Sequence, residues 1–243
     1  MIDIHSHIIY GVDDGPKTLD GSLNLLKEAY RQGVRQVVAT SHRRKGMFET
    51  PEETILSHFL VVKAQVKEQL PDLQLFYGGE LYYSSPMMEQ LEKGYFPTLN
   101  GTRFALVEFS SNTPYKDIHQ AVSKVSLIGI TPVLAHIERY HALAFDDKKV
   151  KDLIQMGAYT QINSVHVTKP KLFGDGLKEY KKRARFFLDK NLVHCVASDM
   201  HNLDSRKPFM KEAYDIVAQA YGAERAEHLF MTNPQSLLDN QYI

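Results

Sequence analysis

The chain has 243 residues, of which 43% are hydrophobic and 24% are charged, as is typical of a soluble globular protein with a sizeable core. Lys plus Arg and Asp plus Glu number 29 each, so the composition provides no overall attraction to nucleic acid or to an anionic membrane. The single cysteine excludes an intrachain disulfide framework and zinc–thiolate clusters. Beside it stand eleven histidines, an excess of imidazole over thiol that favours a hard or borderline metal ion.

Neither a secretory leader nor a membrane helix is visible in the sequence. The first residues lack a basic region followed by an apolar stretch, and no window approaches the roughly 18 consecutive apolar residues of a membrane helix. No Gly/Ser-rich or Pro-rich linker divides the chain. We therefore expect a single domain over residues 1–243, cytoplasmic and not inserted in a membrane.

Short apolar segments that are typical of β-strands alternate with helical or loop segments along the whole chain. A helix is expected from Leu19, and Thr50 is expected to cap a second one, with Pro51 at its first position and Glu53 completing a capping box. Repeating βα units predict an α/β fold with a parallel sheet, either doubly wound or closed into a barrel. Seven strands are expected, at Ile2–Ile4, Val37–Thr40, Leu73–Tyr77, Phe104–Val107, Pro132–Ala135, Tyr159–Ile162 and Val193–Ala197.

Six of the seven strands lead to side chains that can bind a metal ion, whereas the sixth leads to Asn163. In parallel barrels the active site is built at the carboxyl ends of the strands, so such residues would converge on one cleft. A doubly wound sheet would spread them along an edge, so the pattern favours the barrel. In chain order the eight residues are His5, His7, His42, Glu80, Glu108, His136, Asp199 and His201.

Local context adds to this pattern. His5 and His7 are two positions apart on a strand and face the same side, as do Asp199 and His201. Glu108 is flanked by apolar residues, and an isolated buried carboxylate is too costly unless it is paired or metal-bound. In the acidic turn that follows the first strand, the aspartates could orient imidazoles or add a ligand, and for Asp14 both roles stay open.

The other basic residues, the cysteine and the remaining histidines are expected to have structural roles. The basic run Arg43–Lys45 is interpreted as a solvated face in preference to a substrate-binding patch. Cys195 is interpreted as a small buried hydrophobe, and a cysteine-dependent phosphatase is excluded because the sixth residue after it is His201 instead of arginine. The remaining histidines are assigned to the surface or the core: His58, His119, His141, His166, His194 and His228.

Seven segments carry a resemblance to a known family. They are Asp3-Ile4-His5-Ser6-His7, Gly11-Val12-Asp13-Asp14-Gly15-Pro16-Lys17-Thr18, Thr40-Ser41-His42, Gly79-Glu80, Val107-Glu108-Phe109, His136-Ile137-Glu138-Arg139-Tyr140 and Ser198-Asp199-Met200-His201. With them the sequence resembles the PHP (polymerase and histidinol phosphatase) superfamily over essentially its whole length. More narrowly, it resembles the manganese-dependent protein-tyrosine phosphatases encoded with bacterial capsular and exopolysaccharide genes, for which the second segment is the specific one.

The resemblance implies a distorted, TIM-like (β/α)7 barrel that holds up to three divalent ions, with Mn²⁺ the expected metal. One ion would take His5, His7, Glu80 and Asp199. A second would share Glu80 and take Glu108 and His136, and a third would take His42 and His201, with Asp14 as a further candidate.

The expected function is hydrolysis of phosphotyrosine by a metal-bound hydroxide, without a covalent phosphoenzyme. Asp199, Arg139 and Arg206 are the expected catalytic residues, and the two arginines are expected to bind phosphate through their planar forks of donors. No general acid is assigned, because a tyrosine phenolate with a pKa of about 10 is a better leaving group than an alkoxide.

The expected partner is a phosphotyrosine-bearing protein, a tyrosine autokinase that regulates capsule synthesis. One alternative is a small-molecule phosphomonoesterase of the histidinol-phosphatase type. Another is a non-catalytic binding protein, which would show vacant ligand positions, yet all eight strand-end positions are filled. Nucleic-acid processing is disfavoured by the zero net charge.

Overall fold

The structure is a computed structural model that describes residues 1–171 and 174–243. Every ladder between its strands is parallel. The strands of the described residues are β1 (Ile2–Ser6), β2 (Gln36–Ala39), β3 (His42–Arg43), β4 (Gln74–Tyr77), β5 (Glu80–Tyr82), β6 (Phe104–Glu108), β7 (Thr131–Leu134), β8 (Tyr159–Asn163) and β9 (Cys195–Ala197). All seven predicted strands are present, and two of them, β2 and β4, are each followed after two intervening residues by a short continuation, β3 and β5.

The sheet curls and meets itself. Hydrogen-bonded neighbours run in the orders β1-β2-β4 and β3-β5-β6-β7-β8-β9. An isolated parallel bridge joins Ser6 to Met200, and there the His7 amide donates to the Met200 carbonyl over 2.9 Å, while the Asp199 amide donates to the His5 carbonyl over 2.8 Å. The predicted distorted barrel is therefore confirmed over the doubly wound alternative.

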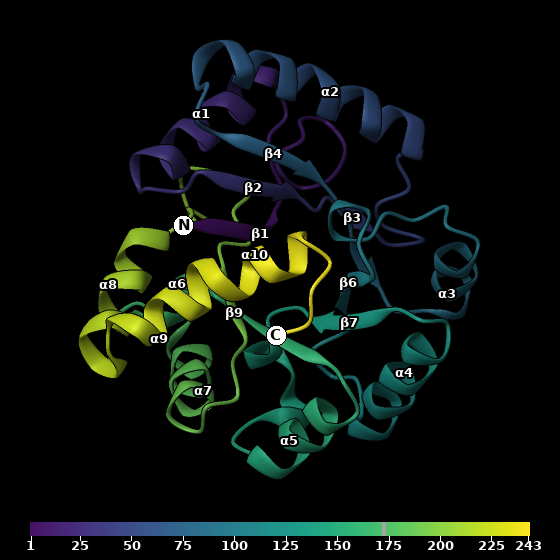
Figure 1. Cartoon of the computed structure of the whole chain (residues 1–243), viewed down its shortest axis with the longest axis vertical. Helices are drawn as coiled ribbons and strands as arrows, with labels where there is room; N and C mark the ends of the chain where they lie inside the picture. Colours follow the sequence, from purple (N-terminus) through teal and green to yellow (C-terminus); the bar gives the residue numbers. More distant parts are fainter. Residues whose placement is uncertain (172–173) are drawn as a thin grey trace.

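Helices surround the strands on all sides in Figure 1. Thr18 caps the first of them by accepting a hydrogen bond from the Gly21 amide. No helix within the described ranges is long and apolar enough to cross a membrane. The helices are α1 (Leu19–Arg31), α2 (Glu52–Gln69), α3 (Ser85–Glu92), α4 (Tyr115–Leu127), α5 (Asp147–Gln155), α6 (Ser164–Val167), α7 (Lys178–Asp189), α8 (Met210–Tyr221), α9 (Ala223–Glu227) and α10 (Asn233–Leu238).

The predicted capping box at the start of α2 is wrong. Pro51 occupies the N-cap position, one residue later than expected, and no side chain caps the helix. The Thr50 hydroxyl donates instead to the Val12 carbonyl over 2.8 Å. This contact links the start of α2 to the acidic loop after β1, which the local sequence pattern could not reveal.

The strands divide the hydrophobic core into two parts. Because side chains alternate along a strand, residues such as Val107 and Val196 pack outward against the helices, while Leu106 and Ala197 pack inside the barrel. Cys195 lies in the interior part and is fully buried, and burial raises the pKa of its thiol, as expected of a structural cysteine. The interior of the barrel is therefore filled by packed side chains.

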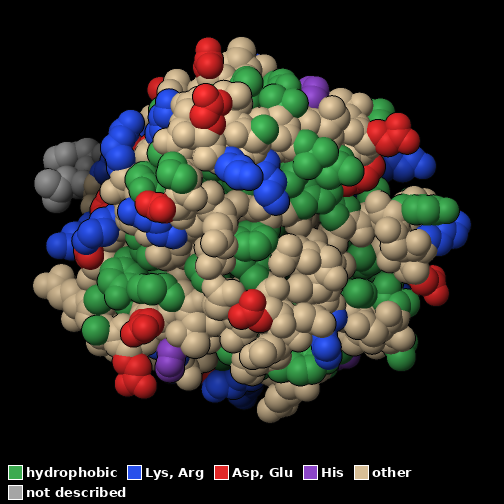
Figure 2. All heavy atoms as spheres, turned by 45° about the horizontal axis from the view of Figure 1, so that its top comes forward, with side chains coloured by type: hydrophobic (Ala, Val, Ile, Leu, Met, Phe, Trp, Pro, Cys, Tyr) green, Lys and Arg blue, Asp and Glu red, His purple; other side chains and the backbone are tan. Residues whose placement is uncertain are grey.

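Helix α10 closes the amino-terminal end of the barrel, opposite the predicted site. In Figure 1 it crosses in front of β1 and β9. Leu237 and Leu238 belong to the interior cluster, and the Asn100 side chain donates to the Leu238 carbonyl. On the face shown in Figure 2, basic and acidic side chains are scattered without gathering into a patch of one sign, in keeping with the zero net charge.

The plug formed by α10 is tested by Leu237→Ala. Leu237 is fully buried, so its truncation removes apolar contacts and leaves a cavity, and we expect the free energy of unfolding to fall by about 2–5 kcal/mol. Leu127→Ala is the control: this side chain is 82% exposed at the end of α4, and its loss should change stability by less than about 0.5 kcal/mol. Urea denaturation measures both, and equal midpoints would contradict the plug.

Candidate metal centre

The inward-facing positions of the strands are occupied by polar side chains at the carboxyl end of the barrel. On β6 the inward position after Leu106 is Glu108, and beyond β9 the inward position after Ala197 is Asp199. The apolar layers thus end in a layer of ligand-type residues. As predicted from the strand ends, the site lies at the carboxyl end of the barrel.

Two of these residues have unusual backbone conformations. His136 (φ 33°) and Asp199 (φ 51°) lie in the left-handed region, which is costly for residues other than glycine. Each lies two residues after the end of a strand, His136 after β7 and Asp199 after β9. The left-handed conformation turns their side chains into the mouth of the barrel. Such local strain, maintained by the surrounding structure, is typical of functional sites.

All nine residues predicted as ligands, Asp14 included, come together in four overlapping groups whose candidate ligand atoms lie within 4.8 Å of one another. Of the three ligand sets that the family resemblance implies, His42, His201 and Asp14 fall within one group. The residues of the other two sets are divided among the remaining three groups. The groups are His7, Asp14, His42 and His201; His5, His136 and Asp199; His5, His7 and Glu80; and His42, Glu80 and Glu108.

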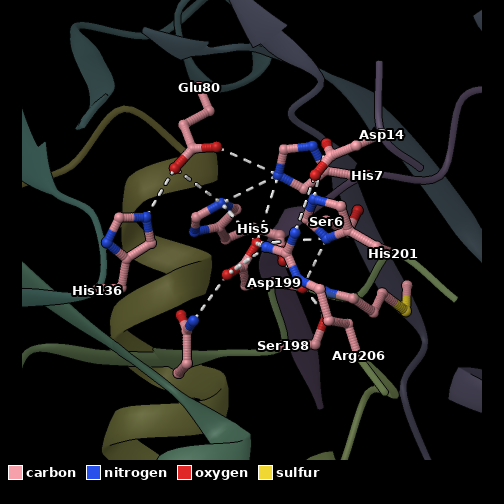
Figure 3. A network of polar contacts seen from close by, with 12 residues as sticks. His5, Ser6, His7, Asp14, Glu80, His136, Ser198, Asp199, His201 and Arg206 are labelled. Carbon is pink, nitrogen blue, oxygen red and sulfur yellow. Dashed lines mark hydrogen bonds and ion pairs between the residues drawn. The ribbon is translucent and has the colours of Figure 1, made fainter. Parts of the chain in front are cut away.

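Glu80 lies at the centre of the cluster. Its Oε1 is 3.0 Å from His136 Nε2 and 3.3 Å from His5 Nε2, while its Oε2 is 3.2 Å from His7 Nε2 and 2.9 Å from His42 Nδ1. Figure 3 shows the carboxylate directed between His136 and the His5–His7 pair. Although burial opposes ionisation, the surrounding imidazoles hold the pKa of Glu80 well below its usual range. A carboxylate in this position can bridge two ions.

The two neighbouring aspartates have different positions. Asp13 is buried, and its Oδ2 lies 2.9 Å from His7 Nδ1 and accepts from the His42 amide over 3.1 Å, so it orients ligand residues from behind. Asp14 faces the cluster, with Oδ1 3.2 Å from His201 Nε2 and 3.6 Å from His42 Nε2. The geometry therefore places Asp14 among the candidate ligands and gives Asp13 the orienting role.

The residues fit a group of divalent cations. Among the described residues, several buried ligand atoms make no hydrogen bond of good geometry, even where another ligand atom is close, as Glu80 Oε2 is to His42 Nδ1 at 2.9 Å. A buried polar atom left unsatisfied in this way costs about 1–3 kcal/mol. Imidazole and carboxylate together suit Mn²⁺, Fe²⁺, Zn²⁺ or Co²⁺. The unpartnered atoms in the cluster are Glu80 Oε2, Glu108 Oε2, His42 Nδ1, His136 Nδ1 and His201 Nε2.

Sequence reasoning missed the supporting residues that β8 contributes. The Gln161 Oε1 atom accepts from the His136 amide over 2.8 Å and lies 3.1 Å from His5 Nδ1. The Asn163 side chain donates to Asp199 Oδ2 over 2.8 Å. Asn163, which the sequence did not predict as a ligand, therefore positions the candidate ligand Asp199. Gln161 and Asn163 follow Tyr159, an interior residue, at intervals of two, which is the signal that could have identified them.

Two arginines reach the same carboxylate. Arg139 Nη2 is 2.6 Å from Asp199 Oδ2, and Arg206 Nη2 is 2.9 Å from Asp199 Oδ1, while Arg206 Nη1 is 3.1 Å from Asp14 Oδ2. Both predicted phosphate-binding side chains therefore enter the cluster.

The prediction that the run Arg43–Lys45 is a solvated face is wrong for its first residue. Arg43 is buried and pairs with Glu52, to which its Nε and Nη2 atoms each donate over 2.8 Å. The Tyr77 hydroxyl also accepts from Arg43, over 3.0 Å. These partners lie far along the sequence or on the next helix, so the charge run alone did not show them.

His166, assigned to the surface or core, is buried, and its Nδ1 lies 2.6 Å from Glu138 Oε1. The Glu138 carboxylate also accepts from the Asn163 amide over 2.8 Å. Glu138 thus links the loop after β7 to the end of β8. This buried pair supports the wall of the site beside Arg139.

A parallel barrel with His, Asp and Glu side chains concentrated at the carboxyl ends of its strands defines a metal-binding (β/α)-barrel protein. The chain belongs to the family described as capsular polysaccharide synthesis, CpsB/CapC, whose model matches residues 1–239. The resemblance drawn from the motifs, to a family linked to capsule genes, is thereby confirmed.

The comparisons with individual proteins extend over the full chain. It is 60% identical over 243 residues, 100% of both chains, to the tyrosine-protein phosphatase CpsB of Streptococcus agalactiae. A solved structure from work on YwqE of Bacillus subtilis and CpsB of Streptococcus pneumoniae, described as unique metal-dependent tyrosine phosphatases, matches with a TM-score of 0.89 at 29% identity, covering 100% of this chain and 96% of the other. An organophosphorus hydrolase variant from Deinococcus radiodurans (TM-score 0.62, 11% identity, 98% and 92% coverage) shares the fold.

Two groups of the metal-free cluster hold protons at neutral pH. Burial lowers the pKa of His7, but its contacts with Asp13 and Glu80 together outweigh burial and raise the pKa to about 10. Burial and then the Glu80 carboxylate raise the pKa of Glu108 to about 8. At pH 7 both groups lie below their pKa and are protonated, whereas a metal ligand must offer a lone pair.

We therefore expect metal binding to release protons. Titration of the metal-free protein with Mn²⁺ at pH 7 should release about two protons per chain, because His7 and Glu108 must each give up one to bind. The measurement is isothermal titration calorimetry in buffers with different ionisation enthalpies. Affinity should fall as the pH is lowered from 8 to 6, and a pH-independent affinity would contradict the ligand roles of both residues.

Proposed function

We propose that this chain is a metal-dependent protein-tyrosine phosphatase. The observation that carries the proposal is the convergence of nine His, Asp and Glu residues at one end of the barrel, in a chain 60% identical over its full length to a tyrosine-protein phosphatase. The proposed substrate is a phosphotyrosine-bearing protein, the tyrosine autokinase that regulates capsular or exopolysaccharide synthesis. The family match to capsular polysaccharide synthesis supports this setting.

The proposed cofactor is Mn²⁺, with up to three ions per chain, and the proposed working unit is the whole of residues 1–243 in the cytoplasm. Glu80 is shared between two of the proposed ion sites, as its contacts to four imidazoles allow. The assigned sets are His5, His7, Glu80 and Asp199; Glu80, Glu108 and His136; and His42, His201 and Asp14.

Divalent ions, when bound, lower the pKa of water toward neutrality and neutralise phosphoryl oxygens. The residues of the chain supply position and charge. Asn163 fixes the orientation of the Asp199 carboxylate, and Gln161 fixes the imidazole of His5 and the backbone of His136. Arg139 and Arg206 present guanidinium groups that can bind phosphoryl oxygens in place of their Asp199 contacts.

Metal removal and Asp199→Ala test the proposal directly. Chelator-stripped protein should lose at least about 10³-fold in turnover of a phosphotyrosine peptide and regain it with Mn²⁺, because nucleophile activation and charge neutralisation both depend on the ions. Asp199→Ala should abolish turnover while the circular-dichroism spectrum stays that of the folded barrel. Full activity in stripped protein would contradict the function, and faster turnover of histidinol phosphate than of the peptide would redirect the substrate class.

Loss of either arginine should weaken phosphate binding. Arg139→Ala and Arg206→Ala each remove a charge-assisted contact of about 1.5–3 kcal/mol, so we expect kcat/KM to fall by about 10–150-fold and inhibition by inorganic phosphate to weaken. Arg206→Lys should restore only part of this loss because an ammonium lacks the planar fork. The control is Arg185→Ala, whose exposed side chain pairs with Asp189 on the same helix. Unchanged kinetics in both active-site variants would remove these arginines from the site.

A further inference from the structure

Arg44 lies close enough to the metal cluster for its charge to act on Glu108, but the two side chains form no ion pair. The Arg44 guanidinium carbon lies over the Tyr82 ring, 4.1 Å from the ring centroid. Within residues 1–171 and 174–243, no carboxylate lies within 4 Å of this guanidinium, and it donates no hydrogen bond. By contrast, Arg43 is paired with Glu52, and Arg139 and Arg206 contact Asp199. Arg44 is thus a half-buried cation held by an aromatic ring, with its hydrogen-bond donors unused.

Arg44 lies at the border of two hollows. One, of about 410 Å³, is the mouth of the metal centre and is lined by Glu108, His136 and Arg139. The other, of about 350 Å³, is an adjoining groove between the loop after β3 and α3. Arg44 lines both. A substrate bound with its phosphoryl group in the metal centre and its neighbouring residues in the groove would therefore extend past the Arg44 side chain.

The groove suits a peptide with an acidic residue. Phe48, Met87 and Phe96 supply apolar surface, and the Phe48 ring stacks on His42 with centroids 4.7 Å apart, which joins the groove wall to the metal centre. The charges of Arg43 and Glu52 cancel in their ion pair. The remaining charged side chains are Arg44 and Lys45 against Glu49, which leaves an excess of positive charge.

We propose that this groove binds the peptide segment next to the phosphotyrosine, and that Arg44 selects an acidic side chain there. The inference rests on the proposed phosphatase function and adds a specificity-determining residue to it. Stacking on Tyr82 fixes the guanidinium plane and leaves its N–H edges free to bind a carboxylate with two parallel hydrogen bonds. Because the ring already orders the side chain, little conformational entropy is lost when the anion binds.

The test uses three phosphotyrosine peptides that differ only in the flanking residues: glutamate, serine or lysine on both sides. The Mn²⁺-loaded wild-type protein should show the highest kcat/KM with glutamate and the lowest with lysine, with about tenfold between glutamate and serine. Arg44→Gln should bring that ratio close to one, and Arg44→Glu should reverse the order in favour of lysine. Each ratio is taken within one variant, so a change in metal loading cancels.

Arg35→Gln provides a matched control. Arg35 also stacks on a tyrosine, with its guanidinium carbon 3.8 Å from the Tyr30 ring centroid, but it precedes β2 at the opposite end of the barrel. This variant should keep the wild-type preference, and the preference itself should weaken as salt is raised.

The possible failures are distinguishable. If the wild type hydrolyses all three peptides equally, or if Arg44→Glu keeps the wild-type order, the role of Arg44 is overturned while the phosphatase function stands. An equal fall with all three peptides in Arg44→Gln also overturns it, because Arg44 would then act on the phosphoryl group common to them. If Mn²⁺-loaded wild type hydrolyses none of them, the proposed function falls and this inference falls with it.

Discussion

The parallel bridge between Ser6 and Met200 is the contact on which the site depends, because it brings the first and last strands of the chain together. Without it, His5 and His7 would lie at one edge of an open sheet and Asp199 at the other. With it, His5 Nε2 lies 3.5 Å from Asp199 Oδ1. Closure therefore crowds imidazoles and carboxylates into one buried volume, where unpaired polar atoms are costly and divalent cations are the natural compensation.

The supporting residues show how that crowding is controlled. Asp13, Gln161 and Asn163 each hold a candidate ligand from behind, and the left-handed backbone at His136 and Asp199 turns both side chains into the barrel mouth. This arrangement fixes imidazole orientations before any ion binds, which reduces the entropy lost on binding. The packed interior and the α10 plug beneath provide the rigid base that such positioning requires.

Strand positions and candidate ligands were readable from the sequence because both follow from local rules: apolar runs of strand length, and metal-ligating side chains immediately after them. What the sequence did not reveal depends on distant partners. Arg43 looks like part of a surface charge run until Glu52 and Tyr77 are brought against it by the fold. The prediction that Thr50 caps α2 was wrong for the same reason, because the Thr50 hydroxyl donates to the distant Val12 carbonyl. Gln161 was missed because an amide inside a strand carries no metal-ligand signal of its own.

Charge balance explains how a chain of zero net charge can accept an anionic substrate. The cluster contains four carboxylates (Asp14, Glu80, Glu108 and Asp199), and Arg139 and Arg206 pair with two of them, Asp199 and Asp14. The three divalent ions proposed would carry more positive charge than the carboxylates carry negative charge, so the loaded site would be cationic and Arg139 and Arg206 would be available to phosphoryl oxygens. Anion binding would then depend on metal binding, because the charges of Arg139 and Arg206 are otherwise matched by Asp199 and Asp14, with which they are paired.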